Sequence, residues 1–382
     1  MSRFPGGEYR DRVERAQHLM RARGIDALLL SSRPNFDYFT GMEMSQPWAV
    51  PTRPQFVIVP REREPALILP EAIAVAAELD TWIGEVHSYT RLDRTDVELV
   101  AEVLARRGLD RATIGLELGL EMRANLPPAD FDALREALGS AELVDGAPLL
   151  WQLRARKSSL EIAEMRRAFR ATDAALVTLF SGDRTGWTER EAVRFANSIA
   201  LQAGADETGF HAVTSGRGEY HRSLAGARDR PLQAGDMLWL DLGMRAAGYW
   251  SDTCRAGIVG GPNAHQRELQ RRIVEATFAG VEVIRPGARV ADVAAETFRW
   301  RDRIRGAVPV PIGRAGHAIG LSITELPHVA PYDETVLETG MVVTVEPFVQ
   351  DDTGMYCAEE VAVVTGDGCE LLTSAPRELF TI

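Results

Sequence analysis

The sequence predicts a mixed α+β protein of two domains, and three observations lead to this fold class. The chain has 382 residues, and single domains usually hold about 100–200 residues. Its first part alternates helical and strand patterns, as α/β domains do. Its second part has long amphipathic helices around two hairpin-like segments, 236–259 and 341–365. Hydrophobic residues make up 45% and charged residues 26%, a composition typical of folded globular proteins.

The first domain is expected to be a small α/β unit spanning residues 1–152. Residues 8–23 place Val13 and Ala16 on one helical face, and Gly24 follows as the end of the helix. Short apolar runs bounded by proline, glycine or polar residues indicate strands. These strands are expected at 25–32, 55–59 and 115–121.

A second domain, residues 153–382, is expected to start after a boundary near 149–156. Ser158 and Glu161 have the spacing of a capping box, which predicts a long helix from this point. Thr188 and Glu191 repeat the pattern and predict the next helix. A third long helix is expected over about 263–284, before Pro286 and Gly287.

The charge balance limits the classes of function. The formal net charge is −12, and nucleic-acid binders usually show a basic stripe, so no nucleic-acid partner is expected. No apolar run approaches the roughly 18 residues that span a bilayer, and the first residues lack the apolar core of a secretory signal. Three cysteines are too few for a disulfide framework, which favours a reducing, cytoplasmic location.

Acidic residues are concentrated where bases are missing. Between Arg314 and Arg377 there is no Lys or Arg, whereas eleven Asp or Glu residues fall in that stretch. Carboxylates in a folded segment must be hydrated or paired with cations, and this stretch supplies no cation of its own.

Each hairpin carries two carboxylates in otherwise apolar strands. The segment 236–259, with a turn at 245–248, holds Asp241 and Asp252. The segment 341–365, with a turn at 351–354, holds Glu346 and Glu359, and a glycine-flanked His317 lies between the two hairpins. One interpretation is that each acid faces solvent on a half-exposed strand. We favour convergence on metal, because buried unpaired carboxylates are costly.

Four carboxylates and one imidazole suit two divalent ions such as Mn²⁺, Co²⁺, Zn²⁺ or Fe²⁺. Two ions held about 3.5–4 Å apart would bind a water molecule between them and lower its pKa, and they would polarise a scissile carbonyl. The sequence therefore predicts a dinuclear metal-dependent hydrolase.

These motifs resemble those of the Xaa-Pro dipeptidase, Xaa-Pro aminopeptidase and creatinase family, which has the pita-bread fold. The resemblance rests on DLG and GYWSD in the first hairpin, GHAIGL and ELP after it, and GMVVTVEP and EEVAVVT in the second. It implies a pita-bread catalytic domain, with two pseudo-symmetric hairpin halves and covering helices, behind a creatinase-type N-terminal domain. The implied metal ligands are Asp241, Asp252, His317, Glu346 and Glu359.

The resemblance also implies roles beyond the ligands. Asp252 and Glu359 are expected to bridge both ions, and Glu346 to handle the proton of the attacking water. His221, in GEYHRSLAG, stands where the family has a histidine that contacts the substrate or the tetrahedral intermediate. The implied reaction is hydrolysis of an amide C–N bond in a small Xaa-Pro peptide.

Several positions depart from the family pattern. Thr324 stands where the family usually has a second histidine, and Gly313 where some aminopeptidases have a further one. His328 is a catalytic candidate that would replace the missing histidine, or else a surface residue. The arginine with which dipeptidases of the family bind a substrate carboxylate has no counterpart in the base-free stretch. This absence favours a longer peptide, or a neutral or cationic small substrate.

Two cysteines and one aromatic loop complete the candidates. Cys254 and Cys357 replace a family Thr and Arg two residues from Asp252 and Glu359, so each faces the same side as its neighbouring ligand. We expect either inert buried thiols or a thiol-sensitive metal pocket. The aromatic loop 35–48 is expected to pack within its own domain. The family resemblance suggests instead that it covers the active site of the partner subunit in a homodimer, with Tyr38 and Trp48 as candidates for substrate contact.

Three hypotheses follow. The first is an Xaa-Pro peptidase with two divalent ions. The second is a same-fold enzyme acting on a non-peptide small molecule, either a creatinase-like or ectoine-hydrolase-like C–N hydrolase or a dimethylsulfoniopropionate-type lyase; Thr324, Cys357 and the missing arginine support it. The third is a non-catalytic binding scaffold, which retention of the whole ligand set disfavours.

Overall fold

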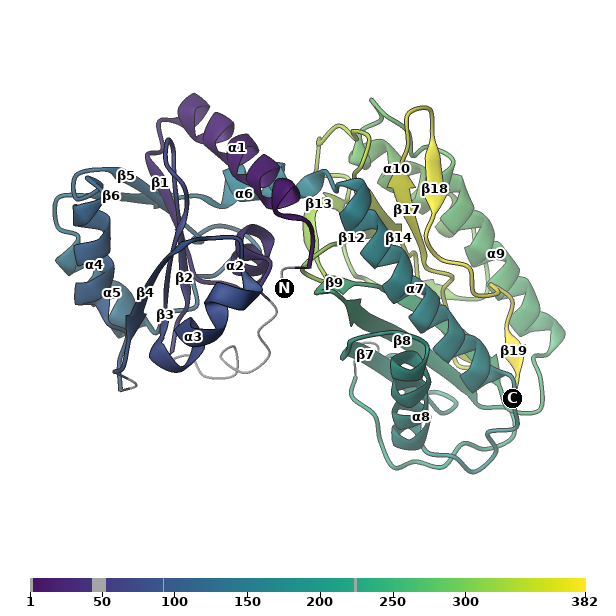
Figure 1. Ribbon diagram of the computed structural model, residues 1–382. Coiled ribbons are helices and arrows are strands. Elements are labelled where there is room, and N and C mark those ends of the chain that lie inside the picture. The colour runs from purple at the N-terminus through teal and green to yellow at the C-terminus, as the bar shows by residue number, and fades with distance from the viewer. Residues whose placement is uncertain (1–2, 43–52, 92, 223–224) are drawn as a thin grey trace. The chain divides into compact units, whose positions relative to one another are not determined.

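The computed structural model describes residues 3–42, 53–91, 93–222 and 225–382. The chain divides into two compact units, Met1–Arg154 and Ala155–Ile382, which are taken separately below (Figure 1). No helix in these described ranges is long and apolar enough to cross a bilayer.

The first unit is built on a six-stranded mixed sheet with strand order β4-β3-β2-β1-β5-β6. Strands β1, β5 and β6 are mutually parallel, whereas β1 and β2 are antiparallel. The strands are β1 (Ala27–Leu30), β2 (Phe56–Pro60), β3 (Ala66–Pro70), β4 (Glu85–Tyr89), β5 (Thr113–Leu116) and β6 (Glu142–Asp145). The helices are α1 (Gly6–Arg23), α2 (Arg33–Thr40), α3 (Glu71–Asp80), α4 (Val97–Arg106), α5 (Pro128–Ala137) and α6 (Ala147–Ala155).

In this unit the predicted end of α1 is confirmed, whereas the strand predicted from residue 115 is shorter than expected. Gly24 ends α1 with φ of 67°, a conformation that glycine adopts at little cost. The strand expected over 115–121 ends at Leu116. The next residue, Glu117, is buried and accepts hydrogen bonds from the main-chain N–H groups of Ser31 and Ser32. Its carboxylate thus caps the turn ahead of α2.

The second unit contains three sheets. The first has the order β19-β10-β8-β7 with β9 paired to β8, the second β11-β15-β16, and the third β13-β12-β14-β17-β18. The first-sheet strands are β7 (Glu207–Ser215), β8 (Met237–Ala246), β9 (Tyr249–Trp250), β10 (Thr253–Ile258) and β19 (Phe380–Thr381). The remaining strands are β11 (Val308–Pro309), β12 (Gly316–Ala318), β13 (Glu325–Val329), β14 (Val342–Val345), β15 (Val349–Asp351), β16 (Gly354–Tyr356), β17 (Glu360–Val364) and β18 (Cys369–Leu371).

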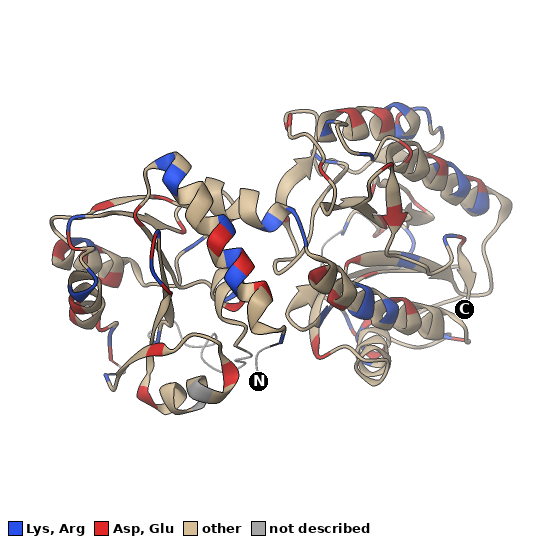
Figure 2. Ribbon diagram, turned by 45° about the horizontal axis from the view of Figure 1, so that its top comes forward, with Lys and Arg blue, Asp and Glu red and all other residues tan. Residues whose placement is uncertain are grey.

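Four long helices pack against the outer faces of these sheets. They are α7 (Ser159–Phe180), α8 (Glu189–Gln202), α9 (Ala264–Val281) and α10 (Val290–Arg301). Helix α7 packs on β8 and β10, and α9 packs on β14 and β17. Both predicted capping boxes form at α7 and α8. These helices carry many charged residues, whereas the strands beneath them carry few (Figure 2).

The second hairpin differs from its expected form. The sequence predicts one continuous hairpin over 341–365, but the chain leaves the third sheet after β14, forms β15 and β16 in the second sheet, and returns at β17. Glu346 and Glu359 lie at the two breaks. Asp252 lies between β9 and β10, which both pair with β8. Two of the four predicted carboxylates, Glu346 and Glu359, therefore sit where the chain passes from one sheet to another.

A candidate metal centre between two hairpins

Strand alternation aims Asp241 away from helices α7 and α8. Leu240 and Leu242, its neighbours on β8, belong to the core under α7 and α8. Met237 and Trp239 belong to a second core on the opposite face. Because successive side chains point to opposite faces of a strand, Asp241 shares the face of Met237 and Trp239.

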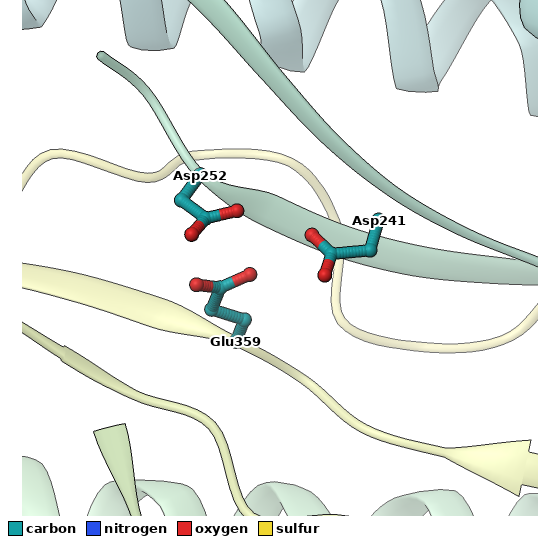
Figure 3. A group of neighbouring side chains, drawn as sticks. All are labelled: Asp241, Asp252 and Glu359. Atoms are coloured by element: carbon teal, nitrogen blue, oxygen red, sulfur yellow. The ribbon is translucent and has the colours of Figure 1, made fainter. Parts of the chain in front are cut away.

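Three carboxylates meet on this face. Asp241 and Asp252 come from the first hairpin and Glu359 from the second, and all three side chains point toward one another (Figure 3). One ligand oxygen from each lies within 4.8 Å of the others, and all three residues are buried. The structure therefore brings together the predicted acids of both hairpins.

His317 and Glu346 complete the cluster. His317 Nε2 lies 3.2 Å from Glu346 Oε1 and 3.6 Å from Asp252 Oδ2. Nδ1 of the same ring lies 2.9 Å from the main-chain oxygen of Ala318. A carbonyl oxygen only accepts, so Nδ1 carries a proton, and Nε2 faces the carboxylates. This is the arrangement of a metal-binding histidine whose second nitrogen is anchored to the backbone.

Thr344 and Gly316 hold these two ligands in place. The Thr344 hydroxyl accepts from the His317 N–H at 3.0 Å and donates to Glu346 Oε1 at 3.2 Å. A Cβ on Gly316 would lie 2.0 Å from the Thr344 carbonyl oxygen. The glycine before His317 is therefore required by the close approach of β12 to β14.

The carboxylates repel one another and are removed from water. Burial, together with the charge of Glu346, raises the pKa of Asp241 to about 7. Burial and the neighbouring acids also raise the pKa of Asp252 and of Glu359 well above its usual range. Oδ1 of both aspartates and both oxygens of Glu359 are buried without a hydrogen-bond partner. Buried oxygens of this kind fit ligation of hard or borderline divalent cations.

A buried ion pair behind the cluster joins the two hairpins. Arg255 on β10 donates to Glu360 Oε1 at 2.9 Å, and both side chains are almost fully buried. Arg255 also donates to the main-chain oxygens of Cys254 and Glu359, each at 2.8 Å. Neither Arg255 nor Glu360 was assigned a role from the sequence, although an arginine in an apolar strand beside a predicted ligand was a signal.

A second buried ion pair supports the segment after His317. Lys157 Nζ lies 3.0 Å from Glu325 Oε2, and each side chain is only 1% exposed. The other oxygen of Glu325 accepts from the Ser322 N–H at 3.1 Å. The single lysine of the chain thus anchors the turn between β12 and β13.

Cys254 lies where the strand period predicts, and Cys357, which follows the end of β16, belongs to the same core cluster. Cys254 is directly opposite Asp241 in the β8–β10 register, so the two side chains share a face. Burial raises the pKa of the Cys357 thiol well above its usual range, and the adjacent Cys254 and Glu359 add to this effect. All three cysteines of the chain are free thiols.

The other sequence candidates are placed as follows. His328 is buried on β13, directly opposite His317, so it is not a surface residue. His221 lies on an exposed turn after β7, with no hydrogen bond to the described residues of the cluster. Tyr38 is fully buried in the first unit under the guanidinium of Arg12, which makes it a core residue there. Trp48 lies outside the described residues.

Comparison with known proteins agrees with this architecture. The model of metallopeptidase family M24 matches residues 163–369, and that of the creatinase/prolidase N-terminal domain matches residues 12–156. An Xaa-Pro dipeptidase of Pyrococcus horikoshii is 26% identical over 97% of this chain and 99% of its own. One of Pyrococcus furiosus is 27% identical over 97% of this chain and 100% of its own.

A solved structure gives the same result. The structure of an Xaa-Pro dipeptidase from Bacillus anthracis has a TM-score of 0.84 and 25% identity, covering 98% of this chain and 100% of its own. The predicted creatinase-type domain and pita-bread domain are thereby confirmed. The chain belongs to metallopeptidase family M24 and is a metal-dependent peptide hydrolase with a creatinase/prolidase N-terminal domain.

Proposed function

We propose that this enzyme hydrolyses the bond before proline in short Xaa-Pro peptides, using two divalent metal ions in its catalytic domain, residues 153–382. Asp241, Asp252, His317, Glu346 and Glu359 would hold the ions, with Asp252 and Glu359 serving both. The supporting observation is the set of buried carboxylate oxygens without hydrogen-bond partners, contributed by both hairpins. The names of the full-length relatives support the substrate class.

The proposed reaction assigns separate roles to the metal ions, to Glu346 and to two histidines. When bound, Mn²⁺, Co²⁺, Zn²⁺ or Fe²⁺ would acidify a water molecule and polarise the scissile carbonyl. Glu346, next to His317, takes the proton of the attacking water for delivery to the leaving nitrogen. His221 and His328 are the proposed groups that face the substrate.

Metal analysis and turnover test this proposal together. Protein purified without chelators should hold about two divalent ions per chain and cleave Ala-Pro when Mn²⁺, Co²⁺ or Zn²⁺ is supplied. Asp241→Asn should lower both metal content and turnover. Fewer than one ion per chain, or no cleavage of any Xaa-Pro bond, would remove the peptidase assignment.

A second candidate is hydrolysis of a C–N bond in a non-peptide small molecule. It is favoured by Thr324 and Cys357, each of which departs from the family pattern beside the ligand segments. A panel of Xaa-Pro dipeptides, longer Xaa-Pro peptides and methylated amines separates the two candidates. Turnover of amines alone would favour the second.

We also propose a cytoplasmic homodimer. Three free thiols are consistent with a reducing compartment, and the family resemblance supports the dimer. Light scattering coupled to size-exclusion chromatography should give twice the chain mass of 42.0 kDa. A monomer mass across the concentration range would contradict the dimer.

A further inference from the structure

We propose that Arg314 binds the carboxylate of the residue that follows the scissile bond, so that the enzyme selects dipeptides. This inference rests on the proposed function and deepens it. It departs from the sequence-based expectation that the missing arginine favours longer or uncharged substrates.

Strand register brings this arginine to the ligand face. His317 and His328 are directly opposite each other in the β12–β13 pair. Directly opposite residues of antiparallel strands have side chains on the same face. The face of His317 is that of the metal cluster, since its Nε2 lies 3.2 Å from Glu346.

Arg314 contacts this face through two neutral acceptors. Its Nη1 lies 3.1 Å from His328 Nδ1, and its Nη2 lies 3.4 Å from Thr324 Oγ1. A guanidinium only donates hydrogen bonds, so His328 Nδ1 accepts and that ring is neutral. The cation thus lies against Thr324, the position where the family usually has a histidine.

The charge of Arg314 is not compensated within the described residues. No carboxylate in the ranges 3–42, 53–91, 93–222 and 225–382 forms an ion pair with it, although its side chain is half-buried. By contrast, Arg228 pairs with Glu189 and Arg255 with Glu360. Two divalent ions would offset the four carboxylates of the cluster and leave Arg314 as a cation with no acidic partner in the part of the chain that the structure describes.

A half-buried guanidinium without an acidic partner favours an anionic ligand, and carboxylate is the anion that it binds with two parallel hydrogen bonds. In an Xaa-Pro dipeptide the free carboxylate is on the proline, immediately after the scissile bond. A longer or amidated peptide has a neutral amide at that place. Arg314 therefore distinguishes dipeptides from their extensions.

The experiment compares Ala-Pro with Ala-Pro amide on the metal-loaded enzyme. The wild type should have a kcat/KM about 10- to 100-fold higher for Ala-Pro, the range expected for hydrogen bonds to a charged group. Arg314→Gln should abolish this preference, mainly through KM for Ala-Pro, and Arg314→Lys should restore part of it. Arg285→Gln is the matched control, because Arg285 is exposed between α9 and α10 and makes no ion pair with a described residue.

A binding measurement separates this inference from the proposed function. Calorimetry should show that the metal-loaded wild type binds proline more tightly than prolinamide, and that Arg314→Gln binds both equally. Absence of Xaa-Pro cleavage by the wild type would reject the proposed function. Calorimetry would still test whether Arg314 binds the free carboxylate. The inference is overturned if Arg314→Gln keeps the preference for the free carboxylate, or if the wild type binds neither ligand or both equally.

Discussion

Arg255 donates a hydrogen bond of 2.8 Å to the main-chain oxygen of Glu359, so a side chain of the first hairpin fixes the backbone of a proposed ligand in the second. The same guanidinium pairs with the buried carboxylate of Glu360. The position of Glu359 relative to Asp252 therefore depends on a charge pair that does not itself contact the cluster.

Replacing Arg255 should weaken both stability and metal binding. Arg255→Met removes one of two guanidinium partners of the buried Glu360 carboxylate, which keeps Arg377. The loss of unfolding free energy should therefore be smaller than the roughly 3–5 kcal/mol expected for a buried charge left without any partner. Metal affinity, measured by equilibrium dialysis well below the melting temperature, should fall as Glu359 loses its support. Arg190→Gln breaks an exposed pair with Asp229 and should change neither quantity. Unchanged metal affinity in Arg255→Met would refute the positioning role.

The metal-free enzyme should lose stability as pH rises. The pKa of Asp241 is raised to about 7 in the fold, whereas an unfolded Asp has a pKa of about 3.9. The folded state binds more protons between these values, so unfolding free energy falls as pH increases from about 4 to 7. Thermal unfolding of chelated protein should therefore show a lower melting temperature at pH 8 than at pH 5, and added Mn²⁺ should reverse the loss.

Asp252→Asn tests the same electrostatic cause. The amide removes one buried negative charge, so chelated Asp252→Asn should melt above the chelated wild type at pH 8, by about 2–4 °C for each kcal/mol gained. The difference should shrink toward pH 4, where the unfolded carboxyl is also protonated. With metal present the order should invert, because the variant has lost a ligand. A chelated variant that melts below the wild type at pH 8 would contradict this account.

Gly316→Ala should displace His317. The added Cβ would lie 2.0 Å from a main-chain oxygen of Thr344, and backbone cannot move aside as a flexible side chain does. We expect a loss of roughly 1–3 kcal/mol in unfolding free energy, the usual cost of overpacking, and weaker metal binding. Gly366→Ala is the control, because nothing lies within 4 Å of its Cβ position. Equal metal affinity in both variants would exclude the steric role of Gly316.

Lys157→Met should be more harmful than removal of the whole ion pair. The single change removes the Lys157 cation from the buried Glu325 carboxylate, at a cost of up to about 3–5 kcal/mol. The double variant Lys157→Met with Glu325→Gln removes both charges and should recover part of that loss in urea unfolding. Additive losses in the double variant would show that the two residues act independently.

The cysteine pair should be chemically inert. The pKa of the buried Cys357 thiol is raised, so the group is protonated near neutral pH and is a poor nucleophile. A disulfide reagent should label Cys254 and Cys357 only after unfolding. The double variant Cys254→Ser with Cys357→Ser should keep its metal content and turnover. Loss of either would restore the alternative of a thiol-sensitive metal pocket.

Sequence patterns predicted the local features well. Capping boxes depend on residues three apart, and the hairpin spacing of Asp241 and Asp252 indicated that they face one site. Long-range pairs were missed: Arg255 reaches Glu359 across 104 positions, and Lys157 reaches Glu325 across 168. Arg314 was overlooked because it lies just before the stretch that has no Lys or Arg. In the fold its guanidinium nevertheless contacts Thr324 and His328, which belong to that stretch.

The position of β19 has a consequence for how this protein is made. Strand β19 pairs in parallel with β10, the strand that follows Asp252, and the neighbouring Ile382 N–H donates to the Ile258 carbonyl oxygen. The sheet that carries the first two proposed ligands is therefore completed by a strand that lies far along the chain from them. The metal site should assemble only after β19 has been synthesised and has paired with β10, and a substitution that breaks this pairing should lower metal affinity.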